Sequence, residues 1–288
     1  KSKTGIKELD YILHGGPGGG EVWMLMGDAK SGKSLGLIHF GIQAVKRFIP
    51  VLHFQLEGKI DEATDRYDSA YLGAKYDDVV MNEIPDDLMQ RMYRTSERKS
   101  KRDLVVRGYT DWDTCSILDI ERDYLELINQ GYQFKLVIID YMDLMKSRKN
   151  YTDERFRQQS IIRDIKSFAV KYNVLVWTAT QANRGKEETR NDPDYVLTSK
   201  NLSEDYGKVR AIDGLVTINC TDEDYKRGVA RLWLDQARMH KAKRLIRVRR
   251  VLNRSLFYVP STKYGLYNIN PVVIKKKLKK KKFKKSVK

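Results

Sequence analysis

Long apolar runs and cysteine-rich motifs are missing from this sequence. No stretch approaches the roughly 20 consecutive apolar residues that a membrane-spanning helix needs, and no signal peptide opens the chain. The two cysteines, Cys115 and Cys220, stand far apart and the four histidines form no cluster, which argues against a disulfide framework or a metal site of these residue types. We therefore expect a protein of a reducing cytoplasm with no membrane partner. The chain starts at Lys1 rather than Met, so we also expect that an N-terminal region is missing.

Acidic residues are too few to balance the basic ones. The 288-residue chain carries 55 Lys and Arg against 38 Asp and Glu, a net charge of +17 at pH 7. Ten of these positive charges belong to the lysines of residues 275–288, a segment with too little apolar content to fold. We predict one folded domain over residues 1–262 and a disordered basic tail over residues 263–288. The tail either solubilises the protein or binds nucleic acid phosphates without sequence preference.

A glycine-bounded loop is the most specific pattern that is present. Residues 21–26 are predicted to form a buried strand and residues 35–48 an apolar helix, and the sequence between them fits G-x-x-x-x-G-K-[ST] at every fixed position. Successive N–H groups of such a loop form an anion-binding concavity, to which the helix dipole adds. Lys33 is expected to reach the β- and γ-phosphates of ATP, and the Ser34 hydroxyl to ligate Mg²⁺. The predicted nucleotide-binding residues are Gly27, Asp28, Ala29, Lys30, Ser31, Gly32, Lys33 and Ser34.

Continuous apolar segments alternate with helical ones along most of the chain. Strands without polar alternation are typical of parallel sheets covered by helices, and we predict an α/β fold with a largely parallel central sheet and helices on both faces. Further strands are expected at residues 51–56, 104–106, 136–140, 174–179, 214–219, 231–234, 245–251 and 256–259, the last ones antiparallel. Helices are expected at residues 4–13, 60–72, 85–101, 116–130 and 158–172, and polar loops at 147–157 and 182–209.

Three polar side chains end three of the predicted buried strands. They are Glu57, Asp140 and Gln181, and ligands collect at this edge of open α/β sheets. Asp140 would hold the Mg²⁺ water shell beside Ser34, Glu57 would polarise the attacking water, and Gln181 would sense the γ-phosphate. Each alone is equally well explained as a solvated strand-end residue, but the three together after a P-loop favour a nucleotide-hydrolysing site.

Several segments extend the P-loop into a longer pattern. They are I-I-D-Y-M-D-L-M at residues 138–145, R-Q-Q at 157–159, T-Q-A-N-R at 180–184 and D-Q-A-R at 235–238. With them the chain resembles the motor domain of DnaB-type replicative DNA helicases, whose corresponding segments are I-D-Y-L-Q-L-M, R-Q-Q, S-Q-L-N-R and G-K-Q-R. The opening T-G-I-K-E-L-D is similar to DnaB, RecA and KaiC relatives alike. The resemblance covers residues 4–259.

The resemblance implies a RecA-like P-loop NTPase domain that uses ATP and Mg²⁺. Lys33, Ser34 and Asp140 would bind the nucleotide and the metal ion, and Glu57 would activate water. Gln181 would couple the state of the γ-phosphate to the loop that follows it. Arg238 would act in trans as an arginine finger on a neighbouring subunit's nucleotide.

The resemblance also implies a homohexameric ring that encloses single-stranded DNA. The loops at 147–157 and 184–209 would line its channel, so the candidate nucleic acid contacts are Arg148, Lys149, Arg157, Arg184, Lys186, Arg190, Lys200 and Lys208. A primase or a helicase loader would be a further partner. The location would be the cytoplasm of a bacterial cell or of a phage-infected host.

The sequence departs from the family pattern at three positions. Gln236 stands where the family usually has a lysine, and Asp143 replaces a common glutamine, which we interpret as a structural or loop-orienting residue. Lys30 inside the P-loop is either an extra phosphate contact or a solvated loop lysine. Two alternatives stay open: a RecA/RadA-like or KaiC-like ATPase, and a nucleotide-gated DNA-binding or loader subunit without unwinding activity.

Overall fold

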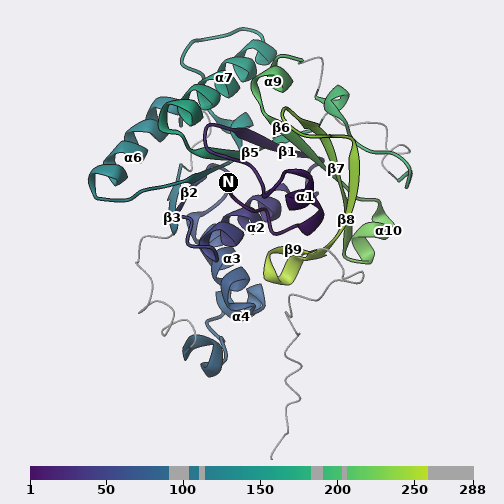
Figure 1. Cartoon of the computed structure of the whole chain (residues 1–288). Helices are drawn as coiled ribbons and strands as arrows, with labels where there is room; N and C mark the ends of the chain where they lie inside the picture. The colour runs from purple at the N-terminus through teal and green to yellow at the C-terminus, as the bar shows by residue number, and fades with distance from the viewer. Residues whose placement is uncertain (91–103, 110–113, 183–190, 203–205, 259–288) are drawn as a thin grey trace, which may run out of the picture.

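A single sheet runs through the molecule and carries every element of the candidate site. The computed structural model describes residues 1–90, 104–109, 114–182, 191–202 and 206–258. Its sheet has nine strands in the order β3-β2-β4-β5-β1-β6-β7-β8-β9 (Figure 1). The strands are β1 Val22–Gly27, β2 Val51–Gln55, β3 Leu104–Gly108, β4 Leu136–Asp140, β5 Leu175–Gln181, β6 Gly214–Asn219, β7 Val229–Ala237, β8 Arg244–Val251 and β9 Leu256–Tyr258.

Most of this sheet is parallel. The strands from β3 to β6 in the sheet order pair in parallel, whereas β7, β8 and β9 add to the β6 edge as antiparallel strands. Gly27 is paired with Gln181, and Gln55 is paired with Asp140. Because parallel strands end at the same edge of a sheet, this register gathers the P-loop and the candidate catalytic residues. The predicted α/β fold is confirmed.

Helices cover both faces of the sheet. The α-helices are α1 Lys7–Ile12, α2 Lys33–Val45, α3 Ile60–Leu72, α4 Tyr76–Val80, α6 Ile117–Asn129, α7 Glu154–Tyr172, α9 Tyr206–Ala211 and α10 Asp222–Lys226, and the 3₁₀ turns are η1 Met142–Leu144, η2 Ser199–Asn201 and η3 Leu252–Arg254. Strand β1 alternates between two cores. Trp23 and Leu25 join the core of α1, α2 and α3, whereas Met24 and Met26 join the core of α6, α7 and α9.

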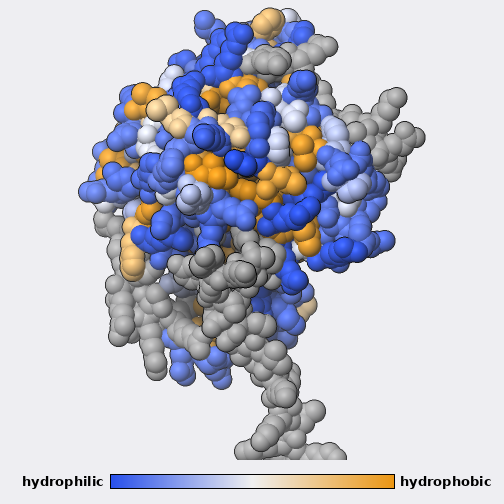
Figure 2. Space-filling model, turned by 45° about the vertical axis from the view of Figure 1, so that its right-hand side comes forward, coloured by the Kyte–Doolittle hydropathy of each residue, from blue (hydrophilic) through white to orange (hydrophobic). Residues whose placement is uncertain are grey.

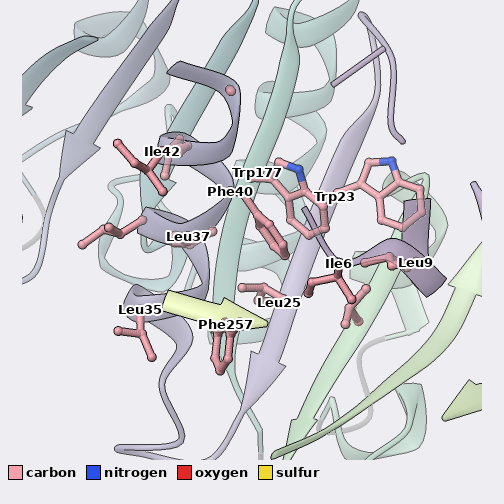
Figure 3. Packing of buried hydrophobic residues seen from close by; sticks show 14 of the residues in the cluster. Ile6, Leu9, Trp23, Leu25, Leu35, Leu37, Phe40, Ile42, Trp177 and Phe257 are labelled. Atoms are coloured by element: carbon pink, nitrogen blue, oxygen red, sulfur yellow. The ribbon is translucent and has the colours of Figure 1, made fainter. Parts of the chain in front are cut away.

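Aromatic side chains fill the space between α2 and the sheet. The ring centroid of Trp177 on β5 lies 4.3 Å from that of Phe40 on α2 and 5.5 Å from that of Trp23 on β1 (Figure 3). Phe257 of β9 approaches the same helix near Leu35. The P-loop helix is therefore held between the parallel sheet and β9, the last strand among the described residues.

Several predicted boundaries were wrong. The predicted loop at 147–157 ends early, because Asp153 accepts a hydrogen bond from the backbone N–H of Arg155 and starts α7 at Glu154. Helix α2 begins at Lys33 rather than at residue 35, and β7 extends beyond the predicted 231–234 on both sides. Helix α9 lies partly within the predicted loop at 182–209. Residues 91–101 of the predicted helix at 85–101, and the predicted tail at 263–288, lie outside the described residues.

The face of the molecule that Figure 2 shows is mainly hydrophilic. Viewed toward the side that carries β7 and β8, polar residues surround a central group of hydrophobic ones (Figure 2). Within the described part of the chain, no helix combines the length and the apolar character that crossing a membrane requires.

Replacement of Trp177 by alanine is expected to destabilise the fold by about 3–5 kcal/mol, because it opens a cavity between α2 and the sheet. Tyr11, which is 84% exposed, provides the matched control, and Tyr11→Ala is expected to change stability by less than about 0.5 kcal/mol. Urea titrations followed by tryptophan fluorescence and circular dichroism measure both values. Equal effects of the two substitutions would contradict the packing of Trp177 between α2 and the sheet.

Candidate nucleotide-binding site

The P-loop joins the end of β1 to the start of α2. A Cβ atom at Gly27 would lie 2.4 Å from the Oγ atom of Ser31, so only glycine fits where the loop leaves the strand. Gly32 has φ +99°, a conformation that side chains with a Cβ rarely adopt, and it immediately precedes the first helical residue, Lys33. These two glycines fold the loop tightly against the positive end of the α2 dipole.

Lys33 lies back across its own loop. Its Nζ atom donates hydrogen bonds to the carbonyl groups of Gly27, at 3.2 Å, and of Asp28, at 3.0 Å. Burial lowers the pKa of Lys33, and the charges of Glu57, Asp143, Asp140 and Asp28 act in the opposite direction. The ammonium group therefore lies near four carboxylates, but its hydrogen bonds go to neutral carbonyl groups. Negatively charged phosphate oxygens in place of these carbonyl groups would form stronger, charge-assisted hydrogen bonds.

Ser34 and Asp140 meet beneath the loop. The Ser34 hydroxyl donates to Oδ1 of Asp140 at 3.2 Å, and Asp140 is completely buried. Burial raises the pKa of Asp140 to about 7, and the hydrogen bond from Ser34 offsets part of this rise. Its Oδ2 atom is buried and has no hydrogen-bond partner within the described part of the chain. A hydroxyl beside a carboxylate oxygen that lacks a partner is a donor set that fits Mg²⁺, which prefers oxygen ligands.

Glu57 follows β2 and projects into solvent at the same edge. The backbone N–H groups of Leu56 and Glu57 both donate to the carbonyl oxygen of Asp140, at 2.7 and 3.2 Å. The charge of Glu57 contributes to the pKa of Lys33 and of Asp140. Glu57 and Asp140 at two strand ends and Lys33 at the start of α2 thus interact electrostatically.

A chain of buried hydrogen bonds supports Glu57 from below. The Tyr67 hydroxyl lies 2.8 Å from Nδ1 of His53, and Nε2 of His53 lies 3.1 Å from Oε1 of Gln55. The amide of Gln55 donates in turn to the carbonyl group of Glu57. Because Gln55 accepts through Oε1, the proton of His53 is assigned to Nε2 and Tyr67 donates to Nδ1. Sequence reasoning missed this network, although two polar residues within an otherwise apolar strand were its signal.

Asp143 organises the end of β5. Its carboxylate accepts hydrogen bonds from the Thr180 hydroxyl and from the backbone N–H of Gln181, each at 2.9 Å, and from Nζ of Lys208 at 3.3 Å. The backbone of Gln181 is thereby fixed, while its side chain remains exposed. These contacts agree with the loop-orienting role expected for Asp143 and join η1, β5 and α9.

The predicted nucleic acid contacts fall into three groups. Lys149 and Lys200 are exposed, and Arg148 is half-exposed with its guanidinium paired to Asp164. Two residues are bound within the chain: Arg157, placed on helix α7 rather than in a loop, donates to backbone carbonyl groups of residues 143 and 145, and Lys208 is buried against Asp143. Arg184, Lys186 and Arg190 lie outside the described residues.

Arg238 lies at the opposite edge of the sheet from the P-loop. It follows β7, donates its backbone N–H to the carbonyl group of Asp213 at 2.7 Å, and pairs its guanidinium with the Asp213 carboxylate at 3.4 Å. Asp213 also accepts from the N–H of Val22, the first residue of β1, whereas Gly27 is its last. At about 3.3 Å per strand residue, the two sites are about 17 Å apart. Arg238 cannot reach the P-loop of its own chain.

A model of the family described as "DnaB-like helicase C terminal domain" matches residues 2–200. The chain belongs to this family. The family resemblance seen in the sequence is confirmed, and Arg238 lies beyond the matched residues.

Curated relatives of this DnaB-like chain are replicative helicases. It is 26% identical over 232 residues to the replicative DNA helicase DnaB of Mycoplasma genitalium, covering 77% of this chain and 47% of that protein. It is 25% identical over 189 residues to the DnaB of Mycobacterium intracellulare, covering 66% of this chain and 32% of that protein. The chain thus spans half or less of the length of these curated relatives.

Solved structures share the fold. One is described as "The Structure Of A DnaB-Like Replicative Helicase And Its Interactions With Primase", with a TM-score of 0.76 and 14% identity, covering 90% of this chain and 63% of that chain. The RadB recombinase has a TM-score of 0.54 and 16% identity, covering 91% of this chain and all of that chain. The RecA-like architecture is therefore confirmed for the DnaB-like domain.

The buried histidines predict how stability depends on pH. Burial lowers the pKa of His53 to about 4, whereas an unfolded histidine takes up a proton near pH 6.5. Between these values the unfolded chain binds more protons, so stability falls as the pH falls, by up to roughly 1.4 kcal/mol per pH unit for this residue. His39, whose pKa burial lowers to about 3, acts in the same sense.

His53→Gln is therefore expected to flatten the decline in stability between pH 6.5 and 4. The measurement is the free energy of unfolding from urea titrations at half-unit pH steps. His14→Asn serves as the control, because His14 is exposed and asparagine tolerates its positive φ. An unchanged slope in His53→Gln would contradict a neutral, buried His53.

Proposed function

We propose that this chain is the ATP-hydrolysing motor of a replicative DNA helicase, which translocates on single-stranded DNA as a ring and unwinds duplex. The observation that carries the proposal is the P-loop with Lys33 and Ser34 set against the buried, incompletely partnered Asp140. Family membership supports it as well. The most direct test is displacement of one strand of a forked duplex in the presence of ATP, with the native mass measured alongside.

The proposed hydrolysis divides its tasks among residues of one sheet edge. Lys33 would leave its carbonyl partners and pair with the β- and γ-phosphate oxygens, and Ser34 and Asp140 would hold Mg²⁺. When bound, Mg²⁺ withdraws charge from the phosphate oxygens. Glu57 accepts the proton of the attacking water, since its carboxylate is exposed at this edge and its charge acts on Lys33. Its backbone is fixed by the carbonyl group of Asp140 and by the amide of Gln55.

The proposed link to DNA passes through the end of β5. Gln181 would sense the γ-phosphate, because its pairing with Gly27 places it at the same edge of the sheet as the P-loop. Its backbone N–H is held by Asp143, which also binds Lys208 on α9, near the far end of the predicted loop at 182–209. A change at Gln181 would therefore be transmitted to the residues that we propose to contact single-stranded DNA. Primase or a helicase loader would bind elsewhere on such an assembly.

Glu57→Gln is expected to bind ATP with Mg²⁺ normally and to lower hydrolysis at least about a hundredfold, because an amide cannot accept the proton of the attacking water. Single-turnover hydrolysis and nucleotide titration measure the two effects separately. Glu62→Gln on α3 is the matched control and should hydrolyse ATP at the wild-type rate. If Glu57→Gln does so too, another carboxylate is the base, and Asp143 and Asp61 become the candidates.

The proposed ring rests on the separation between Arg238 and the P-loop. An arginine at the far edge of the sheet can complete only the site of another subunit, and such closed head-to-tail contacts generate rings. An apolar side chain beside Arg238 is exposed and available for this contact. Met239, next to Arg238, is 82% exposed.

Arg238→Ala is expected to bind nucleotide normally and to hydrolyse it about a thousandfold or more slowly, because the transition-state charge loses its partner. Lys33→Ala is expected to be inactive because it lacks a functional P-loop. Mixing the two variants should restore part of the ATPase activity, since some interfaces then pair an intact P-loop with an intact arginine.

The mixture is assayed under conditions in which native mass spectrometry shows assembly and exchange of subunits. Mixed assemblies without recovered activity would exclude a role of Arg238 in trans. A monomer that hydrolyses ATP at the full rate would overturn the ring.

A further inference from the structure

An arginine occupies a core-facing position on β8. Burial alternates along this strand, so that Ile246, Val248 and Arg250 face inward while Arg247 and Arg249 face solvent. Ile246 and Val248 join the core around α2. Arg250 is only 5% exposed. It therefore places a cation at a position where the alternating pattern of the strand predicts an apolar residue.

The guanidinium of Arg250 is only partly compensated by its surroundings. Its Nη1 atom donates to the carbonyl group of Ser31 at 3.3 Å, and its Cζ atom lies 4.8 Å from the centre of the Tyr225 ring. Its Nε and Nη2 atoms are buried and have no hydrogen-bond partner among the residues that the structure describes. None of the ion pairs found among the described residues includes Arg250. A buried guanidinium without a carboxylate is costly, because neither a carbonyl group nor an aromatic ring neutralises its charge.

The P-loop lies directly beside this charge. Ser31 belongs to the loop and precedes Gly32 and α2, whose positive dipole end makes a further cation unfavourable. Phe257, the cross-strand partner of Arg250, lies over the same turn, since a Cβ atom at Gly32 would be 3.7 Å from its ring. The Oγ atom of Ser31 is also buried without a partner. An anion seated on the loop would offset both the charge and the dipole.

We propose that Arg250 is a nucleotide-binding residue that acts in cis. Its Nε and Nη2 groups donate to phosphate oxygens of the nucleotide held by the P-loop of the same chain, and its Nη1 bond to Ser31 fixes the direction of the guanidinium. Arg238 serves a neighbouring subunit, whereas Arg250 serves its own. This inference rests on the proposed function and adds the terminal hairpin to the nucleotide site.

The experiment uses the full chain and two readouts. The dissociation constant of Mg·ADP is measured for wild type, Arg250→Met, Arg250→Gln and the control Arg249→Met, which alters the next, solvent-facing arginine of the strand. The melting temperature is measured without nucleotide. Both Arg250 variants should weaken ADP binding between about tenfold and about a hundredfold, as expected for lost charge-assisted hydrogen bonds. Their melting temperatures without nucleotide should equal or exceed that of wild type, because an uncompensated buried charge has been removed.

Each readout can overturn the proposal on its own. Affinity within about twofold of wild type in both variants would mean that Arg250 does not contact the nucleotide. Melting temperatures below wild type in both, or failure to fold, would mean that the chain already compensates the guanidinium and that its role is structural. A wild-type chain that binds no ADP would instead refute the proposed function, and Arg249→Met should match wild type throughout.

Discussion

The parallel register of β1, β2, β4 and β5 is the constraint on which the site depends. Pairing of Gly27 with Gln181, and of Gln55 with Asp140, brings four distant segments to one edge at fixed heights. The carbonyl group of Asp140 then accepts hydrogen bonds from the N–H groups of Leu56 and Glu57, where the chain leaves β2. Since a shift of one residue would turn every side chain of a strand to the other face, the two apolar cores fix this register and thereby fix the chemistry.

Charge is unevenly distributed at this edge. Four carboxylates surround Lys33 in the site, and Asp140 is buried so completely that its pKa rises to about 7. Across the loop, Arg250 carries a positive charge that forms no ion pair with any of the described residues. Groups of both signs are thus held in fixed positions. Bound phosphates would neutralise the cations there, and a divalent cation would neutralise the carboxylates. Charges prearranged in this way are what electrostatic catalysis requires.

The features that sequence could predict are local. A P-loop is contiguous, and strand-end residues such as Asp140 and Gln181 follow from apolar runs that a short window detects. Asp213 and Arg250 escape such reasoning because their contacts span 191 and 219 residues. The start of α7 at Glu154 was missed for a different reason: the capping aspartate lies in a polar stretch that resembles a loop. Residue roles in DNA contact depend on other chains and stay predictions.

The last strand closes over the first helix of the nucleotide site. The N–H of Phe257 donates to Nδ1 of His39 across 218 residues, and β9 contacts α2 only after β6, β7 and β8 have extended the sheet. During synthesis, the P-loop therefore emerges long before β9, the strand whose Phe257 packs over it. Because contacts of such sequence separation form slowly, the contact between β9 and α2 is expected to form later than the local contacts of the P-loop and α2.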